Sequence, residues 1–123
     1  MIPIPKKMLP NSVTYEEYKE DMGEGSYFLS PVTLDYVKIE EQQQLVYNPN
    51  GVELVGNAML FYDLTNSTGL TKEPVNESKI TFNGKVYHIV DTDILRGNSN
   101  KPHHYEIKLK WDSLKNLKNV LTG

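Results

Sequence analysis

Apolar and polar side chains alternate in several short runs of this chain, which is the pattern of β-strands that bury one face. The most regular run extends from His104 to Trp111, and its apolar face consists of Tyr105, Ile107, Leu109 and Trp111. Leu54 to Tyr62 is almost continuously apolar, which favours a central strand buried on both sides. Gly56 within this run predicts a close approach of another segment or a bend.

A β-hairpin is predicted at Lys79 to Val90, where Asn83-Gly84 separates two strand-like runs. Asn-Gly tolerates the positive φ angles of a type I′ turn, whose twist matches two antiparallel strands. Apolar residues lie on both faces of the outgoing run, so we interpret the hairpin as scaffold and not as the floor of a catalytic site. The scaffold residues are Phe82, Asn83, Gly84, Tyr87 and Ile89.

Two further strands are predicted in the N-terminal third. Ser12 to Glu20 alternates apolar and polar residues, with a short helix as the alternative because Tyr15 and Tyr18 lie three positions apart. Tyr27 to Glu40 carries two alternating sets that are out of phase with each other. A bulge or sharp bend near Tyr36 would reconcile the two sets.

The remaining segments are predicted to be an arm, two loops and a helix. Residues 1–11 contain three prolines, which exclude a helix interior and predict an extended arm. Polar loops are predicted at Glu41 to Glu53, which contains a turn signal, and at Asp63 to Ser78. Residues 112–121 change to a helical period, which predicts a short helix that docks on the sheet or on another subunit.

Together these elements predict one mainly β domain over residues 1–123, a small barrel or sandwich of about five to six strands with long loops. The length of 123 residues supports a single modest core. No run approaches the ~18 apolar residues of a membrane helix and the start lacks a secretory signal, so we expect a cytoplasmic or packaged protein without a membrane partner. The absence of cysteine excludes disulfides and thiolate metal sites.

The charge of the chain narrows the choice of partners. The net charge is −3 and the isoelectric point is about 5.6, which argues against a protein that grips nucleic acid through a basic surface. Acidic residues dominate Thr14 to Glu41, and lysines dominate Lys101 to Gly123. These regions would complement each other between neighbouring copies of the chain, although two solvated faces are the simpler explanation.

Candidate chemistry is confined to a few histidines and carboxylates. His103 and His104 are adjacent and would point to opposite faces of a strand, so only one of them would join His88 at a metal ion. Such a site would also need a carboxylate, Asp91 or Asp93. No ligand motif is matched, and satisfied histidines and a turn at the two aspartates are the default interpretation. We therefore predict no catalytic residues, no metal and no cofactor.

The eight tyrosines raise a nucleic-acid alternative, because aromatic side chains on a small barrel can stack on bases. Such platforms lie in basic grooves, whereas Tyr15, Tyr18 and Tyr36 lie in the most acidic third of the chain. Core and interface roles are favoured, since tyrosine joins a large apolar body to a hydrogen-bonding tip. A small β-barrel binding module for a ligand or single-stranded nucleic acid is the alternative function.

Four segments, taken together, resemble a known family. The opening IPIPKKMLP, the following SVTYEEY, the hairpin ITFNGKVYHIV and the closing HHYEIKLK are similar, in order and spacing, to the small minor capsid proteins encoded by tailed phages and prophages of Gram-positive bacteria. The resemblance extends from Ile2 to Lys110. It implies a small β-barrel or sandwich with long loops, which agrees with the strands inferred from alternation and turns.

The resemblance implies a structural head-tail connector of the stopper or head-completion type, and no enzyme activity. Such subunits form a ring of roughly six or twelve copies in the neck of the virion. The ring lies below the portal or an adaptor protein, retains the packaged DNA and docks the tail terminator or other tail proteins. Double-stranded DNA would pass transiently and without specific contacts, and assembly would take place in the cytoplasm of the host bacterium.

By the same resemblance, one loop closes the channel. Glu41 to Glu53 is the candidate loop, and Asp63 to Ser78 is its competitor. The candidate plug residues are Gln42, Gln43, Gln44, Leu45, Val46, Tyr47, Asn48 and Asn50. Contacts with neighbouring proteins are expected from the arm and the C-terminal helix, through Ile2, Ile4, Lys6, Lys7, Leu114, Leu117 and Leu121.

Overall fold

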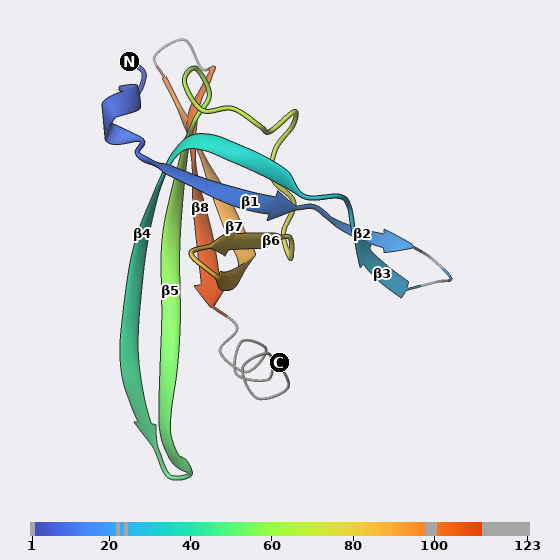
Figure 1. Ribbon diagram of the computed structural model, residues 1–123, viewed down its shortest axis with the longest axis vertical. Coiled ribbons are helices and arrows are strands. Elements are labelled where there is room, and N and C mark those ends of the chain that lie inside the picture. The colour runs from blue at the N-terminus through green and yellow to red at the C-terminus, as the bar shows by residue number, and fades with distance from the viewer. Residues whose placement is uncertain (1, 22, 24, 98–100, 112–123) are drawn as a thin grey trace.

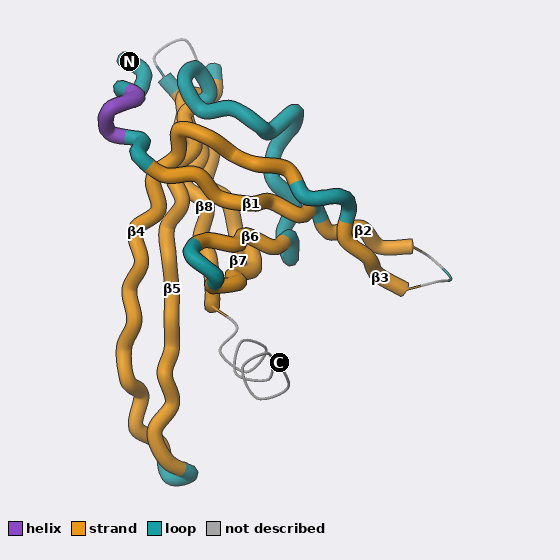
Figure 2. The backbone as a smooth tube through the Cα atoms, viewed as in Figure 1, coloured by secondary structure: helices purple, strands orange, loops and turns teal. Residues whose placement is uncertain are grey.

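The computed structural model describes residues 2–21, 23, 25–97 and 101–111 of the chain. A single 3-10 turn, η1, is followed by eight strands: η1 (Lys6–Met8), β1 (Asn11–Glu16), β2 (Tyr18–Asp21), β3 (Gly25–Phe28), β4 (Val32–Asn48), β5 (Gly51–Asp63), β6 (Lys79–Phe82), β7 (Lys85–Arg96) and β8 (Pro102–Trp111). Six strands close into an antiparallel barrel in the order β1, β4, β5, β8, β7 and β6 (Figure 1). Among the described residues, helix is confined to η1 (Figure 2). The predicted mainly β barrel is confirmed.

Alternate residues of the barrel strands fill its interior. The buried core consists of Val13, Tyr15, Leu34, Val37, Ala58, Leu60, Tyr62, Ile80, Tyr87, Ile89, Tyr105, Ile107 and Leu109. Three of these residues come from β8, so the strand predicted from the most regular alternation is confirmed. Burial of one such side chain contributes roughly 1.5–3 kcal/mol, and all six barrel strands share this one core.

The Asn-Gly hairpin is confirmed. β6 and β7 pair in a register that ends at Phe82 and Lys85, and the turn residues Asn83 and Gly84 have φ angles of 50° and 77°. Both angles are positive, as a type I′ turn requires. The buried side chain of Tyr87 fixes this hairpin on the core, which agrees with a scaffold role.

β7 is longer than predicted. A turn was expected at Asp91 and Asp93, but the strand continues past both residues. Its register against β8 shifts between Ile89 and Asp91, which is the pattern of a bulge. Asp91 and Asp93 were predicted to mark a turn, and this prediction is wrong, since both lie within the strand. Asp91 is paired in register with Lys108 on the outer surface, where strands accept charged residues.

The predicted bend near Tyr36 is confirmed as a bulge in β4. Two successive residues of β1 pair with Asp35 and Val37, and this register skips Tyr36. Tyr36 has a φ angle of 55°, in the left-handed region that non-glycine residues seldom adopt outside bulges and turns. The bulge brings Leu34 and Val37, which are out of phase in the sequence, into the same buried core.

The N-terminal strands are divided differently from the prediction. Ser12 to Glu20 is not one strand, because β1 ends at Glu16 and β2 begins at Tyr18. Tyr27 to Glu40 is interrupted at residues 29–31. These breaks allow β2 and β3 to leave the barrel and pair with each other at its side (Figure 1). Alternation alone could not reveal them, since the period of two is the same in either sheet.

The predicted central strand is confirmed as β5, which lies between β4 and β8. The expectation that both of its faces are buried is wrong, because Leu60 is in the core whereas Asn57 is exposed and Phe61 half-buried. The predicted close approach at Gly56 is confirmed. A Cβ atom placed there would lie 2.9 Å from two atoms of the Trp111 side chain.

The predicted loop at Glu41 to Glu53 is wrong, because this segment belongs to two long strands. β4 and β5 pair continuously from Val37 opposite Tyr62 to Asn48 opposite Gly51. Figure 1 shows the end of this hairpin extending far beyond the other barrel strands. Polar residues exclude a strand only where both of its faces would be buried, and a hairpin that projects into solvent accepts them.

The predicted N-terminal arm is docked on its own barrel. It contains the η1 turn, and Leu9 after this turn is buried. Ile4 N donates a hydrogen bond of 3.0 Å to Asp63 Oδ1, and Asn66 Nδ2 donates one of 2.8 Å to Ile4 O. The prolines exclude a helix interior, as predicted, but they leave the arm able to fold back.

The predicted helix at 112–121 lies outside the described residues, together with Leu114, Leu117 and Leu121. The helix and its contacts therefore stay predictions. Within the part of the chain that the structure describes, there is no helix with the length and apolar character needed to cross a membrane.

Candidate interaction site

The β4–β5 hairpin leaves the barrel as a two-stranded ribbon. β1 pairs with β4 only as far as Val37, and β8 pairs with β5 only as far as Asn57. Within the described part of the chain, no further strand pairs with β4 at residues 38–48 or with β5 at residues 51–56. We call residues 41–56 the ribbon; it projects below the barrel in Figure 1.

One face of the ribbon is apolar and exposed. Leu45, Tyr47 and Val52 are 56%, 76% and 59% exposed, and Tyr47 lies directly opposite Val52. They belong to the same alternating set as Val37 in the core, so this apolar face continues the face that lines the barrel. The sequence from Gln42 to Val52 contains no charged residue. An apolar surface of this kind indicates a contact with another molecule.

The ribbon is braced where it leaves the barrel. The Glu41 carboxylate accepts a hydrogen bond from the Tyr87 hydroxyl and another, of 3.2 Å, from Lys85 Nζ. Burial raises the pKa of the Tyr87 hydroxyl well above its ordinary value of 10.0, and the hydrogen bond to Glu41 and the charge of Glu41 raise it further. The Tyr87 hydroxyl therefore stays protonated and donates at neutral pH.

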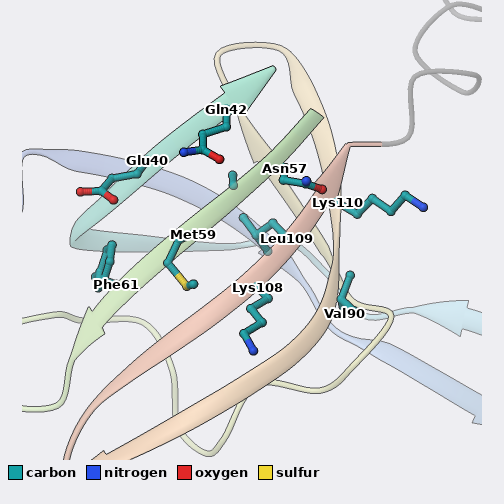
Figure 3. Close-up of a pocket in the computed structure, with 10 residues that line it drawn as sticks. Glu40, Gln42, Asn57, Met59, Phe61, Val90, Lys108, Leu109 and Lys110 are labelled. Atoms are coloured by element: carbon teal, nitrogen blue, oxygen red, sulfur yellow. The ribbon is translucent and has the colours of Figure 1, made fainter. Parts of the chain in front are cut away.

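An open groove crosses the outer surface of the barrel at the root of the ribbon (Figure 3). Its volume is about 720 Å³, and it is lined by Glu40, Gln42, Asn57, Ala58, Met59, Phe61, Val90, Lys108, Leu109 and Lys110. Met59 and Phe61 come from β5, whereas Lys108 comes from β8 and pairs with Asp93 across an Nζ–Oδ2 distance of 3.4 Å. The mixture of apolar and charged side chains suits packing against a polypeptide.

A comparison with known protein families decides the identity of this barrel. The family described as minor capsid protein matches residues 5–109, from the N-terminal arm through the ribbon to β8. This chain belongs to the minor capsid protein family. No curated protein is similar enough to it to count as a relative.

Membership in the minor capsid protein family implies a structural role in a phage and a location in the virion. It also suggests that the chain is not an enzyme. The residues that match the family include both the scaffold hairpin and the ribbon.

The histidines of this minor capsid protein are arranged differently from the prediction. His103 Nδ1 and His104 Nδ1 lie 2.7 Å apart, so the expectation that the two rings point to opposite faces is wrong. The register of β7 against β8 shifts next to them, and such a bulge re-aims side chains. Among the described residues, no group of three or more histidine, aspartate or glutamate side chains could hold a metal ion.

The histidine pair helps to hold the arm on the barrel. His103 Nε2 lies 2.8 Å from the carbonyl oxygen of Ile2, and His104 Nε2 lies 3.1 Å from Glu106 Oε2. A carbonyl oxygen only accepts hydrogen bonds, so His103 donates from Nε2 to Ile2. The arm is thus fastened to β8 through Ile2 and to the end of β5 through Ile4.

The loop Asp63 to Ser78, predicted as the competing plug, is tied to the barrel. Thr68 and Asp35 exchange two backbone hydrogen bonds of 3.1 Å. The hydroxyls of Tyr15 and Tyr62 in the core accept hydrogen bonds from two other backbone amides of this loop, at 3.1 Å each. A loop held at several points is poorly suited to reach a distant axis, whereas the ribbon projects freely from the barrel.

The candidate plug residues all belong to the hairpin of β4 and β5, and the structure thus brings them together. Of the candidate interface residues, Ile2 is 85% exposed, Lys6 and Lys7 are exposed, and Ile4 is half-buried against the barrel. Sequence reasoning missed Val52 on the apolar face and the brace at Glu41. The sequence did contain a signal for this strand, because the alternation of β4 continues through Leu45 and Tyr47 into the predicted loop.

The exposed tyrosines are spread over separate elements. Tyr27 lies on β3, Tyr36 lies at the bulge of β4, and Tyr47 lies on the ribbon. Platforms that stack on bases need neighbouring aromatic faces in a basic groove. The described surface therefore favours contact roles for these residues over the alternative of a nucleic-acid binding module.

Proposed function

We propose that this minor capsid protein is a head-tail connector subunit of the stopper or head-completion type in the neck of a tailed phage of a Gram-positive host. The observation that carries the proposal is the ribbon, which projects from one end of the molecule while the N-terminal arm lies at the other (Figure 1). A subunit of this shape can contact one virion protein at each end. Roughly six or twelve copies would form a closed ring.

The ribbon takes the place of the predicted loop as the channel plug. Its candidate residues from Gln42 to Asn50 are amides and apolar side chains without charge. Copies of an uncharged segment can meet around an axis without like-charge repulsion, which would be strong for a charged segment away from water. The ribbon also extends well beyond the other barrel strands (Figure 1).

The charge of the chain suits a channel through which double-stranded DNA passes. Affinity for DNA depends mainly on lysine and arginine contacts with phosphates. With a net charge of −3, the ring would not grip the duplex, and DNA would slide through it during packaging and ejection. The contact with DNA is therefore transient and independent of base sequence.

The two ends of the subunit would contact different partners. The arm end, with exposed Ile2, Lys6 and Lys7, would meet the portal or an adaptor protein on the head side. The tail terminator or another tail protein would dock on the opposite side of the ring. Assembly of this neck would occur in the cytoplasm of the host bacterium.

The experiment that tests this function is electron microscopy of particles from a phage or induced prophage in which this gene alone is disrupted. Free tails beside heads that have packaged and then lost their DNA would support the connector function. Normal, infectious, tailed virions would contradict it and would return the binding module to first place.

A shortened ribbon tests the plug separately. Gln44 and Leu45 lie opposite Val55 and Leu54, so deletion of these four residues shortens the ribbon while preserving its register and turn. We expect assembled virions whose heads leak DNA. Ser30→Ala, in the exposed link between β3 and β4, is the control and should give stable heads. Full DNA retention by the shortened variant would exclude the ribbon as the plug.

A further inference from the structure

We propose that neighbouring copies of this chain pair their ribbons edge to edge, β4 of one copy against β5 of the next, and so close a barrel of strands around the channel. This inference rests on the proposed ring and names the contact that would close it. Two observations support it: the outward direction of the ribbon's backbone groups, and the small number of protective features along its edges.

Backbone groups on both edges of the ribbon point outward. Ile39 N donates a hydrogen bond of 3.0 Å to Asn11 Oδ1, on the side of β4 that faces away from β5. Alternate residues of an antiparallel strand repeat this direction, so the backbone groups of Glu41, Gln43, Leu45 and Tyr47 also point away from β5. The continuous register then directs the backbone groups of alternate β5 residues from Val52 to Gly56 away from β4.

These edges carry few of the features by which proteins normally protect an edge strand. Such features are short length, charged side chains, proline and bulges. In the described structure, β4 and β5 pair over residues 37–48 without a register shift. The sequence from Gln42 to Val52 has no charge, Glu53 is the one charged residue of the β5 edge, and Pro49 is the one proline and lies in the turn. An edge of this length, with one charge and no bulge, indicates that it pairs with another strand.

A second copy of the chain satisfies both edges at once. β4 and β5 run in opposite directions, so a rotation about an axis along the ribbon brings β4 of one copy against β5 of the next in antiparallel orientation. Every copy then uses both edges, and the contact closes into a ring. A two-fold contact between two β4 edges would stop at a dimer and leave both β5 edges open.

Pairing would also stabilise the ribbon itself. An isolated two-stranded hairpin is at best marginally stable in water, and three or more strands with an apolar face are needed for independent stability. Paired ribbons would place the apolar face of Leu45, Tyr47 and Val52 beside the same face of each neighbour. These side chains, now more than half exposed, would gain contacts on both sides.

The number of copies determines the width of such a barrel. With roughly 4.8 Å between strands, twelve strands from six copies enclose a backbone circle about 18 Å across, and twenty-four strands from twelve copies enclose one about 37 Å across. Strand tilt widens both circles. Side chains would fill most of the smaller barrel, whereas the larger one would leave an open channel. Six copies therefore correspond to a closed stopper and twelve copies to an open passage.

Introduced cysteines test the contact, because the chain contains no cysteine of its own. The double variant Gln43→Cys, Val52→Cys carries one thiol on each edge strand. A short bismaleimide is added to the concentrated full-length protein and to isolated virions, and the products are separated under denaturing conditions. Equivalent residues of neighbouring copies would lie two strand spacings apart, about 10 Å, so one thiol per chain can link two copies. We expect a ladder of covalent oligomers beyond the dimer from the double variant, while each single variant stops at the dimer. The control pair Gln43→Cys, Ser30→Cys should also stop at the dimer.

A proline on the edge separates backbone pairing from side-chain contact. In the double-cysteine background, Leu45→Pro removes an outward-pointing N–H, whereas Leu45→Ala keeps it. Neither substitution removes a hydrogen bond between β4 and β5, so both variants should remain folded. We expect Leu45→Pro to lower the yield of the ladder at least tenfold and Leu45→Ala to lower it no more than about twofold.

Three results would overturn the inference: a ladder that is unchanged by Leu45→Pro, a double variant that stops at the dimer, or monomers only in both samples. A double variant that stops at the dimer would indicate pairing of two β4 edges. These results are distinct from failure of the connector function, which would appear as normal virions after disruption of the gene. Virions that need the protein to keep their DNA but give no ladder would reject the ribbon pairing alone.

Discussion

The substitution Asp63→Asn tests how the N-terminal arm is held on the barrel. The Asp63 side chain is buried, with 0% exposure. Its Oδ1 accepts a hydrogen bond of 3.0 Å from Ile4 N, and its Oδ2 accepts bonds of 3.0 Å and 2.8 Å from Thr65 N and Asn66 N. An amide offers only one acceptor oxygen, so the substitution places a donor against at least one backbone N–H.

The arrangement with the lowest cost places the amide oxygen of the variant at the position of Oδ2. The hydrogen bond from Ile4 N is then lost. A hydrogen bond to a charged acceptor contributes about 1.5–3 kcal/mol, and a buried donor left without a partner costs about 1–3 kcal/mol. The two effects overlap because the arm can move away, so we expect a loss of about 2–4 kcal/mol. For a chain of this size, the loss corresponds to a decrease in Tm of roughly 6–20 °C.

Two measurements check this expectation. Thermal unfolding followed by the fluorescence of the single tryptophan, Trp111, gives the change in Tm, and hydrogen exchange of the Ile4 amide gives the loss of protection. Asp35→Asn is the matched control, because Asp35 accepts an exposed hydrogen bond of 2.6 Å from the Ser12 hydroxyl. A Tm equal to that of the control, or unchanged protection of Ile4, would refute the anchoring role of Asp63.

Three other substitutions test the core and the base of the ribbon. Gly56→Ala should destabilise the barrel by about 1–3 kcal/mol, because the new Cβ would lie 2.9 Å from both Cβ and Cε3 of Trp111. Urea unfolding checks this, and the effect should become smaller in a Trp111→Ala background, which removes the Cε3 contact and keeps the Cβ contact. Tyr87→Phe should lower stability at neutral pH by about 1–2 kcal/mol through loss of the bond to Glu41. The folded-state pKa of Tyr87 is raised, so its contribution to stability is complete below about pH 10 and is lost as the pH rises further. Tyr87→Phe should therefore make the decrease of unfolding free energy at alkaline pH shallower. An unchanged slope would contradict the raised pKa. Leu60→Ala, at a fully buried position, should cost about 2–5 kcal/mol in the same urea assay, and a loss below that range would show that the site collapses around the smaller side chain.

The parts of the fold that could be predicted are those in which a short stretch determines its own structure. Asn83-Gly84 fixes a type I′ turn through its backbone preferences, and the alternation of β8 reports directly which face is buried. The bulge at Tyr36 was also accessible, because two alternating sets out of phase can share one core only if the strand skips a residue. In each case the signal is local and needs no knowledge of the partner strand.

The features that sequence reasoning missed depend on residues far apart in the chain. The arm is docked through Asp63, some 59 positions from Ile4, and nothing in the prolines of the arm indicates this partner. The two histidines share one side because of a bulge between β7 and β8, which is set by the pairing of two strands. The breaks around β2 and β3 likewise depend on which of the two sheets each strand joins. Alternation does not reveal this, because it is the same in both sheets.

The ribbon was missed for a reason that bears on its function. A strand is recognised in a sequence by the burial of one face, and residues 41–56 project beyond the core that would provide this burial. The alternation is nevertheless present in Leu45, Tyr47 and Val52, whose side chains are more than half exposed in the single chain. The proposed ring would supply the burial that the single subunit lacks, since exposed apolar residues along a strand edge favour association. The segment that contradicts the loop prediction is therefore also the surface at which the contacts of this minor capsid protein are expected.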